Sequence, residues 1–63
     1  MNWDQIKGDW EQAKGSVKAQ WGKLTDSDLT EIEGQRDKLV GKIQKAYGVG
    51  KEEAERQVDE FKP

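Results

Sequence analysis

The groups in this 63-residue chain that could perform chemistry are carboxylates, lysines, Tyr47 and the hydroxyls of Ser16, Thr25, Ser27 and Thr30. The sequence has no histidine and no cysteine, so the side chains most used for proton transfer near neutral pH and for zinc binding are missing. Carboxylate pairs perform acid–base catalysis only in a cleft that shifts their pKa values apart. A chain this short, with 32% hydrophobic residues, cannot readily build such a cleft. We therefore expect no catalytic residues and no enzymatic activity.

The nearest approach to a metal-binding motif is the acidic group Asp26, Asp28 and Glu31. It lacks the oxygen spacing and the central glycine of an EF-hand loop. The spacing of Thr25 and Asp28 is better explained as a capping box, in which the two residues satisfy the free amide groups at a helix start. The sequence therefore predicts no metal site and no cofactor.

Charge is abundant but evenly mixed along the chain. Charged residues make up 38% of the sequence, and 11 basic and 13 acidic residues give a net charge of −2. Nucleic-acid binding normally requires lysine and arginine concentrated on one face. No apolar run is long enough to span a bilayer or to form the core of a signal peptide. We expect a cytoplasmic protein that does not bind nucleic acid.

The first half of the chain carries the strongest helical pattern. Apolar residues advance in steps of three and four from Trp3 to Leu24, which places them along one side of a helix. This pattern predicts one long helix near residues 3–22, and Asn2 with Gln5 could cap its start.

Three further helices are predicted near residues 26–33, 35–47 and 51–61. Thr25 and Asp28 begin the short one, and Gly48 ends the next because glycine accepts the left-handed conformation that closes a helix. No segment shows the alternation typical of a strand. The expected fold is a single all-α domain over residues 1–63, a small antiparallel bundle of about four helices: one long, one short and two medium.

The aromatic residues fit two roles, one in the core and one on a binding surface. As core residues they join the aliphatic side chains in a predicted core of Trp3, Ile6, Trp10, Val17, Trp21, Leu29, Ile32, Leu39, Ile43, Tyr47, Val58 and Phe61. Large rings are seldom fully buried in so small a domain, and tryptophan is enriched at binding hot spots. The candidate interaction surface therefore consists of Trp3, Trp10, Trp21 and Tyr47.

Glycines recur with a step of seven residues, at 8, 15 and 22 and again at 34, 41 and 48. The stretch from Gly15 to Gly22 matches that from Gly41 to Gly48, which indicates a degenerate duplicated helix. Gly8 and Gly15 lie opposite the tryptophans on the first predicted helix, so we expect them to face solvent. They either weaken the helix without a packing reason or let a second helix approach closely.

Three segments carry a family resemblance: WGKLTD at residues 21–26, IEGQRDKLVGKIQ at residues 32–44 and KEEAE at residues 51–55. With the residues around them they resemble the CsbD-like family of small bacterial general stress-response proteins. The resemblance implies a compact helical bundle, cytoplasmic residence and raised abundance under general, osmotic or stationary-phase stress. It implies no reaction and no site residues. The glycine content and the mean hydropathy of −1.14 also resemble the hydrophilins.

Two kinds of function remain open. The leading hypothesis is a protective protein that shields apolar surface on stressed client proteins, because a highly charged and nearly neutral chain stays soluble. The alternative is a partner-specific interaction module that uses the tryptophan-bearing helix face. Peripheral membrane binding is weaker, because acidic residues dilute the basic face that it requires. The partners themselves are not identified by the sequence, and a monomer is favoured.

Overall fold

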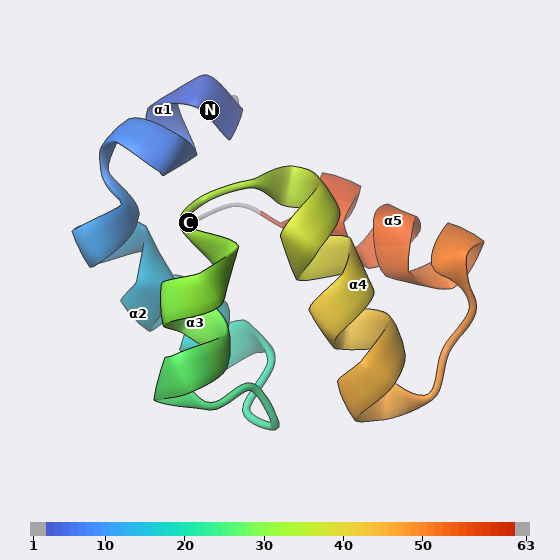
Figure 1. Ribbon diagram of the computed structural model, residues 1–63. Helices are drawn as coiled ribbons and strands as arrows, with labels where there is room; N and C mark the ends of the chain where they lie inside the picture. The colour runs from blue at the N-terminus through green and yellow to red at the C-terminus, as the bar shows by residue number, and fades with distance from the viewer. Residues whose placement is uncertain (1–2, 62–63) are drawn as a thin grey trace.

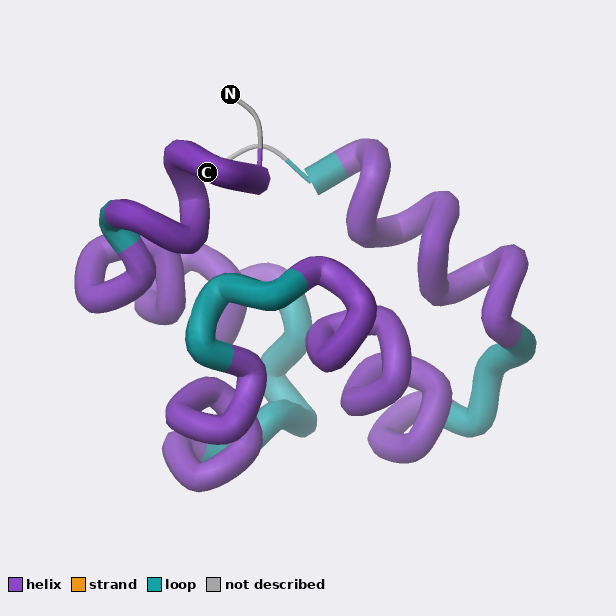
Figure 2. The backbone as a smooth tube through the Cα atoms, turned by 45° about the horizontal axis from the view of Figure 1, so that its top comes forward, coloured by secondary structure: helices purple, strands orange, loops and turns teal. Residues whose placement is uncertain are grey.

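The computed structural model describes residues 3–61, which fold into helices and contain no strand (Figures 1 and 2). The five helices are α1 (Trp3–Gly8), α2 (Trp10–Gln20), α3 (Asp26–Ile32), α4 (Arg36–Tyr47) and α5 (Lys51–Glu60). They form a compact body of 27 × 22 × 17 Å. The all-helical prediction is confirmed for these residues. The finer prediction of an antiparallel bundle of four helices is not confirmed, and Asn2 lies outside the described residues.

The predicted long first helix is wrong, because the chain bends between α1 and α2 (Figure 1). Asp9 has φ −108° and ψ 34°, outside the helical range. Gly8 and Asp9 are successive weak helix formers, so continuing the helix through them has little local support. Across the bend, Ile6 is buried, and the indole N–H of Trp10 donates to the carbonyl of Leu29 at 3.0 Å. Tertiary contacts therefore outweigh the continuous apolar period.

Local signals at two of the other helix ends act as predicted. The amide of Asp28 donates to Thr25 Oγ1 at 3.1 Å, and the amide of Thr25 donates to Asp28 Oδ2 at 3.0 Å, so the capping box is confirmed. Gly48 ends α4 in the left-handed conformation with φ 67°. The end of α3 is less expected, since Glu33 adopts φ 51° and Gly34 follows with φ 76°.

The core lies among α2, α3, α4 and α5. Eight of the predicted core residues are buried: Ile6, Val17, Trp21, Leu29, Ile32, Leu39, Ile43 and Val58. The other four are half-buried at its edge: Trp3, Trp10, Tyr47 and Phe61. Four buried residues were absent from the predicted core: Ala13, Leu24, Val40 and Ala54. The apolar row of the predicted first helix extended to Leu24, but Leu24 lies after the end of α2, in the linker to α3.

Helix α1 is held against the rest of the molecule at Gly34. A Cβ atom built on Gly34 would lie 2.6 Å from the Cα of Lys7, closer than two such atoms approach in proteins. The backbone of α1 therefore passes directly over the turn between α3 and α4. Only a residue without a side chain combines this contact with a left-handed backbone.

Gly8 and Gly15 have no such role, because a Cβ on either would meet nothing within 4 Å. The solvent-facing prediction for these glycines is confirmed. We expect Gly8→Ala with Gly15→Ala to stabilise the fold by about 1–2 kcal/mol, since glycine in an exposed helix costs about 1 kcal/mol relative to alanine. Thermal unfolding followed by circular dichroism measures the change. Gly48→Ala is the matched control and should lower the melting temperature, because its positive φ strains alanine. A lower melting temperature for the double variant would contradict the expectation.

The ion pairs between helices share one arrangement of positive and negative charge. Within residues 3–61, each ion pair that joins two helices has its cation on α2 or α4 and its anion on α3 or α5. Their N–O distances are 2.8 Å for Lys18–Asp26, 3.2 Å for Lys42–Asp28, 2.5 Å for Lys42–Glu31, 2.8 Å for Arg36–Asp59 and 3.8 Å for Arg36–Glu55. Consecutive helices from α2 to α5 thus present opposite charges to each other.

Candidate interaction surface

Trp21 belongs to the core. Its side chain is only 2% exposed, and its ring centroid lies 5.1 Å from that of Phe61. The indole N–H donates to Gln57 Oε1 at 2.9 Å, and the Gln57 amide donates to Glu53 at 3.0 Å. The polar edge of Trp21 is therefore satisfied inside the molecule, and the ring offers almost no surface to a partner.

Trp3 and Trp10 lie half-buried at the α1–α2 side of the molecule. Trp10 is fixed by its hydrogen bond to the Leu29 carbonyl, which orients the ring while part of it remains exposed. A half-exposed ring in a fixed orientation loses little conformational freedom on binding. This pair is the part of the predicted surface that is best placed to contact another molecule.

Tyr47 ends α4 and lies apart from the tryptophans of α1 and α2. Its hydroxyl accepts the backbone N–H of Lys23 at 3.1 Å, and the Lys23 ammonium lies 5.2 Å from the ring centroid. In Figures 1 and 2 the α1 helix and the end of α4 lie at opposite sides of the molecule. The four predicted surface residues therefore do not form one patch.

Three residues that the sequence reasoning did not place on the surface also present partly exposed apolar side chains: Ala46, Val49 and Phe61. Together with Trp3, Trp10 and Tyr47 they form a discontinuous apolar edge around the core. Val49 lies in a short linker between two helices, where neither helical nor strand periodicity applies. Its hydrophobicity next to Gly48 and Gly50 was the only signal in the sequence.

Three carboxyl groups that form hydrogen bonds or ion pairs have lowered pKa values. The backbone amide of Thr25 and the Lys42 ammonium hold the pKa of Asp28 below its usual value of 3.8. Lys18 lowers the pKa of Asp26, and Arg56 together with Gln57 lowers that of Glu53. These shifts arise from contacts at a helix start, between helices and, for Glu53, within α5. They indicate structural ion pairs rather than an acid and a base with separated pKa values.

Acid should destabilise the protein through these groups. A carboxyl whose folded pKa is depressed contributes stability above its unfolded pKa and loses it as the pH falls through the folded value. We therefore expect the melting temperature to fall as the pH drops below about 4, near the ordinary carboxyl pKa values. Asp28→Asn should lower the melting temperature at neutral pH and flatten its fall in acid, whereas Glu52→Gln, at an exposed carboxyl, should alter neither. A wild-type melting temperature unchanged between pH 5 and pH 2 would contradict this.

The described residues provide no group of three or more acidic side chains that could hold a metal ion. Their buried residues are apolar, and no buried side-chain nitrogen or oxygen among them lacks a partner. None of the helices of residues 3–61 is long and apolar enough to cross a membrane. The fold and surface define a small helical protein with an apolar interior, ion pairs on its exterior and a partly exposed, discontinuous apolar edge.

Comparison with known proteins assigns this chain to a family. Residues 4–56 match the CsbD-like family, and the chain belongs to it. The UPF0337 protein YjbJ of Escherichia coli O6:H1 is 61% identical over 61 residues, which cover 97% of this chain and 88% of that protein. The UPF0337 protein pc0632 of Protochlamydia amoebophila is 57% identical over 61 residues, covering 97% and 92%. YjbJ of Salmonella typhimurium is 60% identical over 58 residues, covering 92% and 83%. The names of these relatives describe no reaction.

Proposed function

We propose that this is a non-enzymatic stress-response protein of the cytoplasm that binds apolar surface exposed on stressed client proteins. The observation that supports the proposal most is the pair of partly exposed rings of Trp3 and Trp10. Partly exposed rings on a surface rich in charged residues can contact a hydrophobic patch on another protein while the rest of the surface stays hydrated. Family membership fits a general stress role.

The charged exterior supports the same function at high concentration. Acidic and basic residues are interspersed, with a net charge of −2, so long-range repulsion between copies or from a client is small. The exposed ion pairs each contribute little to stability, typically about 0–1 kcal/mol, but they keep the surface polar. Such a protein can approach both acidic and basic client proteins without strong electrostatic repulsion.

A client-aggregation experiment tests this proposal. Heat-denatured citrate synthase is followed by light scattering with increasing amounts of the wild-type protein, and we expect a later and smaller rise in scattering. Trp3→Gln should weaken the effect because it removes a large partly exposed ring, whereas Lys51→Gln, an exposed polar control, should retain it. Full aggregation in the presence of a molar excess of the wild-type protein would contradict the proposal.

A second candidate function is docking to one particular protein through Trp10. The fixed orientation of its indole favours this alternative, because a rigid aromatic anchor suits a specific pocket. Cross-linking in stressed cells distinguishes the two functions. A single enriched partner that is lost in Trp10→Phe would favour docking, and a broad set of denatured proteins would favour the protective function.

A further inference from the structure

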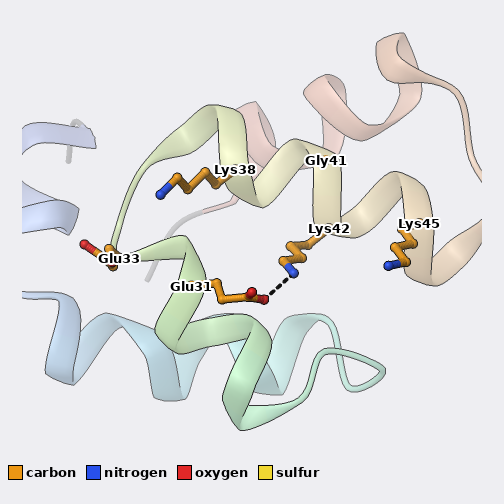
Figure 3. A pocket seen from close by; sticks show the side chains of 6 residues that line it. All are labelled: Glu31, Glu33, Lys38, Gly41, Lys42 and Lys45. Carbon is orange, nitrogen blue, oxygen red and sulfur yellow. Dashed lines mark hydrogen bonds and ion pairs between the residues drawn. The ribbon is translucent and has the colours of Figure 1, made fainter.

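An open groove of about 520 Å³ lies between α3 and α4 (Figure 3). It is lined by Glu31, Glu33, Lys38, Gly41, Lys42 and Lys45. Figure 3 shows the two glutamates on the α3 side and the three lysines along α4, with Gly41 among the lysines. The groove therefore has one basic wall and one acidic wall.

Two cations of the basic wall have no anionic partner within residues 3–61. Lys42 is engaged by Asp28 at 3.2 Å and by Glu31 at 2.5 Å. Lys38 and Lys45 form no ion pair with any residue between 3 and 61. They lie seven positions apart on one side of α4, which separates them by about 10 Å along the helix axis.

Gly41 keeps the floor of the groove open. A Cβ on this residue would meet nothing within 4 Å, and its φ is not in the left-handed range, so neither packing nor backbone geometry requires glycine here. A glycine within a helix lets another chain come closer to the backbone than any other residue does. Its position between Lys38 and Lys45 would admit a ligand backbone between the two free ammonium groups.

The corresponding helix of the internal repeat provides a contrast. Gly15 lines a smaller hollow of about 190 Å³ between α2 and α3. The two lysines there are already neutralised, since Lys14 pairs with Glu11 at 3.0 Å and Lys18 pairs with Asp26 at 2.8 Å. Of these two hollows, at Gly15 and at Gly41, the one on α4 has cations available to an incoming anion and the one on α2 does not.

From this arrangement we infer that the α3–α4 groove binds an acidic helical segment of another protein. Two carboxylates seven positions apart in a helix match the separation of Lys38 and Lys45. Glu33 and Glu31 on the opposite wall disfavour a uniform polyanion such as nucleic acid, but they tolerate a helix whose other side carries lysine or arginine. Neither Trp3 nor Trp10 lines this site, so the inference goes beyond the proposed function and does not depend on it.

Fluorescence anisotropy tests the inference with a labelled helical peptide that carries glutamates seven positions apart and lysines on the opposite side. We expect saturable binding to the full-length protein that weakens as salt is added. Lys38→Glu with Lys45→Glu should weaken binding by about tenfold or more, because charge reversal places like charges in contact. Lys14→Glu with Lys51→Glu changes the net charge equally at residues that do not line the groove, and binding should stay within about threefold. Equal losses in both double variants would show a general charge effect and overturn the site.

Gly41→Leu separates groove occupation from folding. Leucine stabilises a helix relative to glycine, so the melting temperature should rise while peptide binding is lost through steric exclusion. Glu33→Gln should weaken peptide binding, because it removes a negative charge that faces the lysines of the peptide. Unchanged binding in a well-folded Gly41→Leu variant would overturn the groove as the site. Tighter binding of a DNA duplex than of the peptide would overturn the polypeptide ligand.

Discussion

Trp21→Ala is expected to leave most of the protein unfolded at room temperature. Removing a buried tryptophan side chain costs about 3–5 kcal/mol, and a single core of this size rarely supplies more than about 3–5 kcal/mol in total. Trp21 also loses its ring contact with Phe61, and Gln57 loses the donor to its side-chain oxygen. Far-UV circular dichroism at 25 °C should show the loss of helix directly.

Two further variants test how the ring, the indole donor and the buried position of Trp21 contribute to stability. Trp21→Phe keeps an aromatic ring but removes the indole donor, so it should cost less than Trp21→Ala and remain folded. Trp3→Ala removes a ring of the same kind from a half-buried position and should also remain folded. If Trp3→Ala destabilised the protein as much as Trp21→Ala, the centre of the core would lie elsewhere than the structure places it.

Gly34→Ala should produce the second large loss, of about 2–5 kcal/mol. Alanine in the left-handed conformation costs about 1–2 kcal/mol, and forcing an atom into a packed contact costs about 1–3 kcal/mol more. Here the atom would lie 2.6 Å from the Cα of Lys7, so the backbone of α1 would have to move. Amide hydrogen exchange should show the loss first in α1, with chemical denaturation giving the total.

Glu33 provides the matched control for Gly34. It also has a positive φ, of 51°, but its side chain is exposed. Glu33→Gly relieves the backbone strain without touching α1, so stability should be unchanged or should rise by up to about 1 kcal/mol. A similar loss in Glu33→Gly and Gly34→Ala would show that the turn, and not the contact with Lys7, limits stability.

Local signals in the sequence predicted most helix boundaries but not the path of the first helix. The capping box of Thr25 and Asp28 and the terminal glycine at 48 involve neighbours in sequence, so the residue types alone determine them. The bend at Asp9 arises from distant contacts, the burial of Ile6 and the hydrogen bond of Trp10 to Leu29. No periodicity within residues 3–22 could reveal those contacts.

The candidate surface was harder to predict than the fold. Trp3, Trp10 and Trp21 share one apolar period, yet Trp21 is buried and the other two remain partly exposed. The difference arises because α5 returns over Trp21 and places Gln57 and Phe61 against it. The α3–α4 groove could not be predicted from the sequence either. Its charge depends on which of the three lysines on α4 forms an ion pair with a carboxylate on another helix.

The alternation of charge from α2 to α5 also has a consequence for folding. An arrangement that placed α3 directly against α5 would bring carboxylates from both helices together, and one that placed α2 against α4 would do the same with ammonium groups. Each ion pair adds little to the native state, but repulsion raises the free energy of these misassembled topologies. The apolar core of this chain is small. Repulsion between like charges in the alternative arrangements therefore helps the native topology to form.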